Sequence, residues 1–127
     1  MIVKQPILSG RVRRTPKSFS WVDHRLVRDR HLERCSHAAA ALYLFLVCVG
    51  DREGLSYYSD ESLAEKLRME PDLLRQARAE LIGNDLVAWR RPMYQVLSLE
   101  PVTERRASRA AMSLGAILRQ AKEAGHD

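Results

Sequence analysis

The sequence predicts an α+β domain that is mainly helical and carries a small β-hairpin. Three observations lead to this fold class. The longest apolar run covers residues 38–49, which is the length of a buried helix and too short to span a bilayer. Two shorter helical patterns, over residues 60–68 and 71–82, follow each other across a brief turn. Two runs rich in β-branched and aromatic residues, 86–89 and 94–99, flank the sequence Arg-Arg-Pro.

The first 18 residues are predicted to form an irregular basic arm. They contain two prolines, one glycine and five Lys or Arg residues, and they include no acidic residue. The arm is either a nucleic-acid-contacting extension or a solubilising tail. Residues 19–35 mix apolar and charged side chains, and we expect a short helix near 22–30 that packs on the domain. We expect Trp21 to anchor this packing rather than to act as a stacking platform, because aromatic side chains dominate core burial.

The apolar helix at 37–49 is expected to be central. Ser36 is a suitable N-cap and Gly50 a suitable terminator. Because the helix is apolar all round, we expect every other element to pack against it and Cys48 to be a core residue. With 6% aromatic residues in the chain, the core should consist mostly of Leu, Ala and Val. A short strand over 55–59 follows.

The next two helices carry clear start and stop signals. Ser59 can cap the first, which should end near Arg68–Met69. Pro71 suits the first position of the second helix, where its missing N–H costs nothing, and Gly83 closes that helix. Helical spacing directs Leu74, Ala77 and Leu81 toward the core and leaves the following side chains outside: Asp72, Leu73, Arg75, Gln76 and Ala79.

The chain then forms a hairpin and a last helix. Trp89 and Tyr94 flank the hairpin turn and are expected to form a cross-strand pair rather than to stack on bases. Residues 103–124 carry an apolar stripe of mostly Ala and Leu, which predicts an amphipathic helix. This helix either packs on its own domain or pairs with a second copy, and we favour the homodimer.

The stretch "SDESLAEKLRMEPDLLRQARAELIGNDLV", followed by the hairpin, resembles a winged helix-turn-helix domain. The resemblance covers roughly residues 36–99 and is strongest to the small modules of replication initiators and mobile-element proteins. Together with the arm and the last helix, it divides the chain into three expected parts: a basic arm (1–18), the winged helix-turn-helix domain (19–100) and a C-terminal amphipathic helix (101–127).

The resemblance implies a sequence-preferring double-stranded DNA-binding protein that regulates transcription or replication. Residues 71–82 would be the recognition helix in the major groove, with Arg75 suited to guanine and Gln76 to adenine. The stem of Arg78 would lie along the core edge while its head reaches phosphate. The wing arginines would contact phosphate or the minor groove, or else form an ordinary polar turn. The implied DNA-binding residues are Arg11, Arg13, Arg14, Lys17, Leu73, Arg75, Gln76, Arg78, Arg90 and Arg91.

The charge distribution keeps an alternative open. The net charge is +5, but the excess lies in residues 1–34, where nine basic residues face three acidic ones. Residues 35–98 carry seven basic and nine acidic residues, which is a poor surface for phosphate by itself. A protein-interaction adaptor on the same fold, within a replication, transposition or nucleoprotein complex, is therefore the second hypothesis. Single-stranded nucleic acid or an RNA–protein complex, bound through the arm, is the third.

The sequence lacks the motifs of metal-binding proteins and of common enzyme classes. His31 and Cys35 are four residues apart, but no CxxC, HxH or HExxH pattern indicates a metal site. No phosphate-binding glycine loop or nucleophile elbow indicates an enzyme, and we expect no cofactor. Cys35 and Cys48 point different ways on a helix and are expected to be free thiols. We expect a cytoplasmic protein with no membrane partner and no secretory signal.

Overall fold

A computed structural model describes residues 2–99 of the chain. The predicted C-terminal helix over 103–124, and its suggested role in dimerisation, lie outside the described residues. The described residues form four α-helices and one three-stranded antiparallel sheet, so the α+β prediction is confirmed. In chain order the elements are η1 (Ser9–Arg11), α1 (Arg25–Arg28), η2 (Leu32–Arg34), α2 (His37–Val49), β1 (Leu55–Tyr57), α3 (Asp60–Leu67), α4 (Pro71–Gly83), β2 (Val87–Arg90) and β3 (Met93–Val96).

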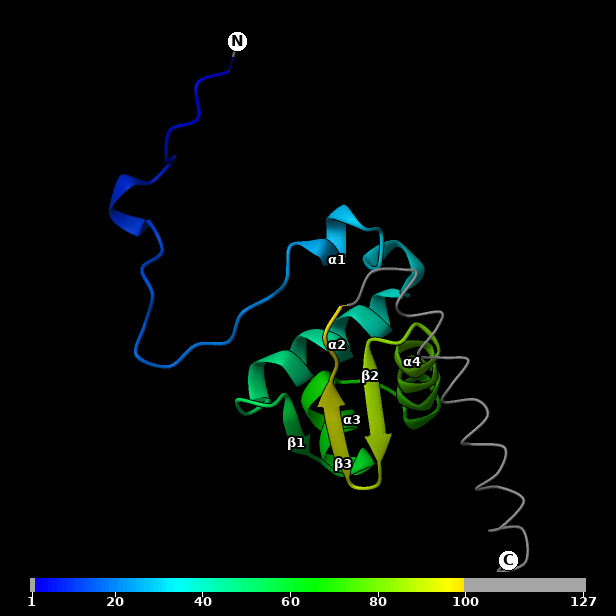
Figure 1. The fold of residues 1–127 in the computed structure, drawn as a ribbon. Coiled ribbons are helices and arrows are strands. Elements are labelled where there is room, and N and C mark those ends of the chain that lie inside the picture. Colours follow the sequence, from blue (N-terminus) through cyan, green and yellow to red (C-terminus); the bar gives the residue numbers. More distant parts are fainter. Residues whose placement is uncertain (1, 100–127) are drawn as a thin grey trace, which may run out of the picture.

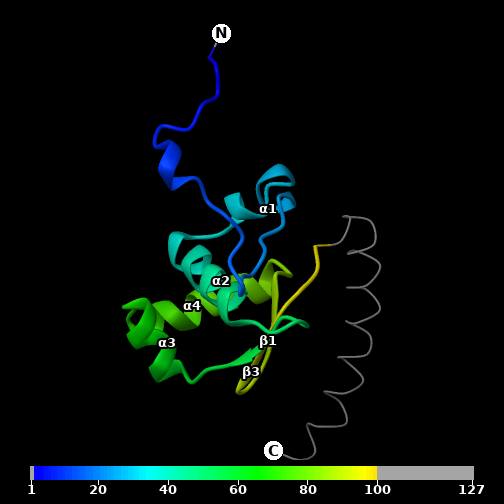
Figure 2. The same ribbon diagram turned by 90° about the vertical axis from the view of Figure 1, so that its left-hand side faces the viewer.

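The sheet has the order β1-β3-β2, so β3 is its central strand. The predicted hairpin is confirmed, with Trp89 opposite Tyr94 and Arg90 opposite Met93. The other edge is formed by β1, where Ser56 pairs with Tyr94. Figure 2 shows α2, α3 and α4 gathered on one side of this sheet, which gives the domain two layers.

The core lies between these layers and is built mostly from leucine, as expected. Six leucines from α2 to β2 have exposed fractions of 1% or less: Leu42, Leu46, Leu63, Leu74, Leu81 and Leu86. Tyr94 is the aromatic exception and is fully buried. Because the apolar residues of each helix recur at three- or four-residue spacing, one face of each helix enters this core.

The expected central role of α2 needs correction. This helix packs on α4 and β3, but only Ala39, Leu42 and Leu46 are buried. Leu44 and Cys48 are exposed, so Cys48 is not a core residue. An apolar sequence therefore does not guarantee burial on all sides, because the domain supplies neighbours for only part of the helix surface.

The predicted helix N-caps are confirmed. The Ser36 Oγ accepts a hydrogen bond from the Ala39 N–H at 3.1 Å, and the Ser59 Oγ accepts one from the Ser62 N–H at 3.1 Å. Pro71 occupies the start of α4. Arg68 has a left-handed φ of 53° at the end of α3, which turns the chain through three residues into α4. These local signals are sufficient to predict α3, a short turn and then α4 without any tertiary contact.

The N-terminal segment differs in part from the prediction. Residues 2–18 are exposed and irregular apart from η1, as expected for an arm, and they extend from the domain at the upper left of Figure 1. The predicted helix near 22–30 is only the four-residue α1. Leu26 is buried, whereas Trp21 is 75% exposed, so the expectation that Trp21 is a packing anchor is wrong.

Within residues 2–99, no helix combines the length and the apolar character needed to cross a membrane. The two cysteines are both free thiols, as expected.

Candidate nucleic-acid interface

Helix α4 has two chemically distinct faces. Its inner face holds Leu74, Ala77 and Leu81, each with no exposed surface. The side chains predicted to point outward are all exposed: Asp72, Leu73, Arg75, Gln76 and Ala79. Arg75 and Gln76 therefore point to solvent from a helix whose opposite face packs in the core.

Arg78 corrects the expectation of an outward head. Its side chain is only 7% exposed, and its Nη1 donates to Asp60 Oδ1 at 2.7 Å and to the Tyr94 Oη at 2.9 Å. The guanidinium carbon also lies 3.8 Å from the centroid of the Trp89 ring. The head is thus directed inward, because three polar or aromatic partners from α3, β2 and β3 converge on it.

The tip of the hairpin carries two arginines that the sequence predicted to contact DNA. Arg90 and Arg91 are both exposed. The Arg91 guanidinium carbon lies 5.6 Å from the Trp89 ring centroid, so this side chain shares an aromatic neighbour with Arg78. The rings of Trp89 and Tyr94 lie 6.1 Å apart across the two strands, which confirms the predicted cross-strand pair.

Trp89 brings α4 and the hairpin tip together, because the guanidinium carbons of Arg78 and Arg91 lie 3.8 and 5.6 Å from its ring centroid. The hydrogen bond from Arg78 lowers the pKa of the Asp60 carboxyl below its ordinary value, and partial burial opposes the change. The positive charges of Arg91 and Arg75 lower the pKa further. The ion pair with Asp60 holds Arg78 at the start of α3, and Arg75 lies one helical turn before Arg78 on α4.

Arg75 has a local partner in the free protein. It forms an ion pair with Asp72 one helical turn earlier, and the two side chains are 54% and 84% exposed. This exposed pair holds the Arg75 guanidinium close to the surface of α4. A ligand that needs Arg75 must compete with Asp72 for its hydrogen bonds.

The arm and α4 are not brought together. The basic side chains of the arm are exposed, namely Arg11, Arg13, Arg14 and Lys17. In Figure 1 the arm leaves the domain at the upper left, whereas α4 lies on the right. The ten predicted site residues therefore separate into three groups: the arm, the outer side of α4 with the hairpin tip, and the inward-directed Arg78.

Sequence reasoning missed the residue that fixes α4 to α2. Glu80 accepts hydrogen bonds from the Ser36 backbone N–H at 2.9 Å and from the Ser36 Oγ at 2.5 Å. These bonds lower the pKa of Glu80. The Glu80 carboxylate therefore stabilises the N-terminus of α2 through its N-cap residue. The two residues are 44 positions apart in the sequence, so no local pattern could predict the contact.

Among residues 2–99, no three His, Cys, Asp or Glu side chains are grouped closely enough to hold a metal ion. No protein-family model, curated protein or solved structure matches the chain significantly.

Proposed function

We propose that this protein is a sequence-preferring double-stranded DNA-binding protein on a winged helix-turn-helix domain, and a small regulator of transcription or replication. In this proposal α4 lies in the major groove and the hairpin tip contacts the DNA backbone. One observation carries it: the guanidinium carbons of Arg91 at the tip and Arg78 on α4 lie 5.6 and 3.8 Å from the same Trp89 ring, and Arg75 is one helical turn from Arg78 on the outer side of α4. A helix backed by a core and flanked by a cationic hairpin suits insertion into a groove.

The exposed side chains of α4 have the chemistry of direct readout. A guanidinium such as Arg75 can pair with both acceptors of guanine in the major groove. The amide of Gln76 can donate to and accept from adenine. Leu73 is 42% exposed and offers apolar contact for a thymine methyl group.

The acidic residues nearby set the expected strength of binding. Asp60 is neutralised internally by Arg78, so it does not present a free charge to phosphate. The proposed interface on α4 and the hairpin tip supplies three exposed cations, Arg75, Arg90 and Arg91. We therefore expect a shallow salt dependence, with a slope of about −2 to −3, because each phosphate contact contributes about −0.9.

Selection from a random duplex library on the purified full chain tests the proposal. We expect an enriched sequence, and then a loss of about 5- to 150-fold in affinity for it in Arg75→Ala, which corresponds to one bidentate base contact. Arg28→Ala is the matched control, because Arg28 is an exposed arginine on α1. No enrichment, or equal losses in both variants, would refute the docking arrangement.

An interaction adaptor is the second candidate, and a specific observation favours it. On α3 and the following turn, three exposed carboxylates outnumber two exposed cations: Glu61, Glu65 and Glu70 against Lys66 and Arg68. Such a surface repels phosphate and suits a basic protein partner. A stable protein partner that is lost on reversing the charge of these three residues, together with no duplex affinity at low salt, would favour the adaptor.

A further inference from the structure

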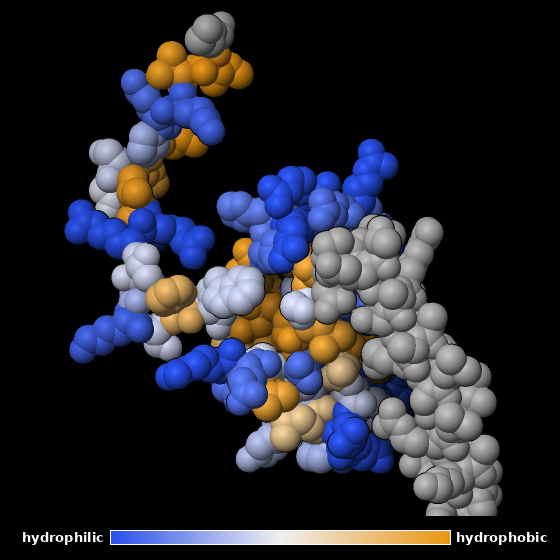
Figure 3. Space-filling view, viewed as in Figure 1, coloured by the Kyte–Doolittle hydropathy of each residue, from blue (hydrophilic) through white to orange (hydrophobic). Residues whose placement is uncertain are grey.

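A groove of about 680 Å³ lies at the other end of β3 from the hairpin tip. Its walls come from residues 19–25, the C-terminal half of α2, the turn at 51–54 and the chain at 95–99. Figure 3 shows hydrophobic surface in the middle of this side of the domain, bordered by hydrophilic side chains. The groove is therefore separate from the surface proposed to contact duplex DNA.

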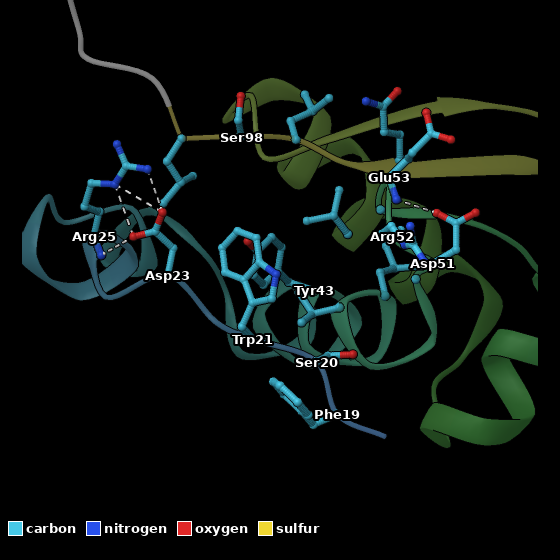
Figure 4. A pocket seen from close by; sticks show the side chains of 18 residues that line it. Phe19, Ser20, Trp21, Asp23, Arg25, Tyr43, Asp51, Arg52, Glu53 and Ser98 are labelled. Atoms are coloured by element: carbon cyan, nitrogen blue, oxygen red, sulfur yellow. Dashed lines mark hydrogen bonds and ion pairs between the residues drawn. The ribbon is translucent and has the colours of Figure 1, made fainter. Parts of the chain in front are cut away.

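Aromatic side chains dominate one wall of this groove. Phe19, Trp21 and Tyr43 line it, and the first two are 64% and 75% exposed. Figure 4 shows Trp21 and Tyr43 on the same side of the opening, with Phe19 at its edge. Tryptophan normally buries most of its surface, so a ring this exposed beside a cavity is available for stacking.

The segment that presents Trp21 is held in place at several points. The Ser20 hydroxyl donates to the Cys48 carbonyl at 3.4 Å, which fastens the segment to α2. Asp23 accepts bonds from the Arg25 side chain and backbone, and these bonds lower the pKa of Asp23 to about 2. Leu26 then enters the core with 5% exposure. Trp21 is thus exposed on an anchored stretch of chain and not on a free end.

Arg25 and Arg52 line the groove beside three carboxylates, Asp23, Asp51 and Glu53, so the attraction for an anion comes from the arm. Two of its carboxylates are already engaged: Asp23 with Arg25, and Asp51 with the backbone N–H groups of Glu53 and Leu55 at 2.8 and 2.9 Å. The arm leads into the aromatic wall of the groove, because Lys17 lies two residues before Phe19. Residues 2–18 carry five basic side chains and no acidic one.

We propose that this groove binds unpaired bases of a single-stranded nucleic acid, stacked on Trp21 and Phe19, while arm cations hold the phosphates. Aromatic platforms beside a cationic track are how proteins bind single strands without reading sequence. The volume lies within the range of pockets that enclose small molecules, so a base with its sugar fits. A base inside a duplex is stacked on both neighbours and has no free ring face to offer, which separates this site from the α4 surface.

The test measures binding of a 15-nucleotide oligo(dT) to the full chain by fluorescence anisotropy at low salt. We expect saturable binding and a loss of about 5- to 150-fold in Trp21→Ala, the range of one base–aromatic stack. Tyr57→Ala is the matched control, because Tyr57 is 69% exposed on β1 and does not line the groove. Bound oligo(dT) should also quench the tryptophan fluorescence of the wild-type protein, and this quenching should vanish in Trp21→Ala.

Three results would overturn the proposal. The first is no binding of oligo(dT), and the second is equal binding by wild type and Trp21→Ala. The third is equal binding of oligo(dT) and an abasic oligonucleotide, which would show that the arm cations bind the phosphates and the groove binds no base. Quenching of Trp21 fluorescence by an acidic apolar peptide, with no response to oligo(dT), would instead assign the groove to a protein. Arg75→Ala should leave oligo(dT) binding unchanged, so failure of the duplex proposal and failure of this one are distinguishable.

Discussion

The Arg78 guanidinium binds the Asp60 carboxylate at 2.7 Å and thereby joins the middle of α4 to the first residue of α3. The same guanidinium donates to Tyr94 at the centre of the sheet. One buried cation therefore links both helices to the hairpin. The relative placement of α4 and the hairpin tip, on which the duplex proposal depends, rests on this contact.

Arg78→Ala should destabilise the domain by about 2–4 kcal/mol, because it removes a buried cation and leaves Asp60 and the Tyr94 hydroxyl without their partner. Urea unfolding followed by circular dichroism measures the change. Arg75→Ala, at an exposed position on the same helix, should alter stability by less than about 0.5 kcal/mol. Similar values for the two variants would contradict a structural role for Arg78.

The ion pair also predicts a pH dependence. Because the folded state lowers the pKa of Asp60, the pair stabilises the protein above the ordinary aspartate pKa of about 3.9, and this contribution is lost as the pH falls through the lowered value. Arg78 stays charged throughout. The free energy of unfolding should therefore differ between wild type and Asp60→Asn at pH 6, and the difference should shrink toward pH 2.5. A constant difference across that range would exclude the carboxylate as its source.

Glu80 and Ser36 should be energetically coupled. Ser36→Ala removes an N-cap and should cost about 1 kcal/mol, and Glu80→Ala should cost a similar amount by losing its two hydrogen bonds. The double variant should cost less than the sum, since both changes remove the same interaction. A double-mutant cycle in urea measures the coupling. Strict additivity would show that the bond between α2 and α4 does not contribute.

Asp72→Asn should strengthen duplex binding by about two- to five-fold. The substitution frees Arg75 from its ion pair and removes one negative charge beside the proposed DNA backbone. Glu33→Gln is the control, because Glu33 forms an equally exposed pair with Arg30 outside the proposed interface. A gain in both variants would indicate a general effect of net charge.

Deleting residues 2–18 should reduce the salt dependence of oligo(dT) binding. The deleted segment holds five cations, and each phosphate contact with a single strand contributes about −0.7 to the slope. The slope should therefore fall in magnitude by up to about 3.5. An unchanged slope would show that the arm does not contact the strand.

Much of this domain could be predicted from local sequence. Ser59 and Pro71 start α3 and α4, the spacing of Leu74, Ala77 and Leu81 defines the inner side of α4, and the hairpin register follows from its short turn. Each of these features depends on residues within about one helical turn or one strand of each other. Intrinsic backbone preference and hydrophobic spacing act over that range.

Three features were decided only by the tertiary structure. Arg78 is as polar as Arg75, yet it points inward because Asp60, Trp89 and Tyr94 happen to converge on it. Trp21 and Cys48 have apolar surfaces, yet they remain exposed because no element of the described chain covers them. Sequence by itself determined where α2, α3, α4 and the hairpin lie and which side of α4 is apolar, but not the extent of α1. Whether a given side chain binds a neighbour or faces solvent depended on residues distant in the chain, since burial is a property of the packed neighbours and not of the residue.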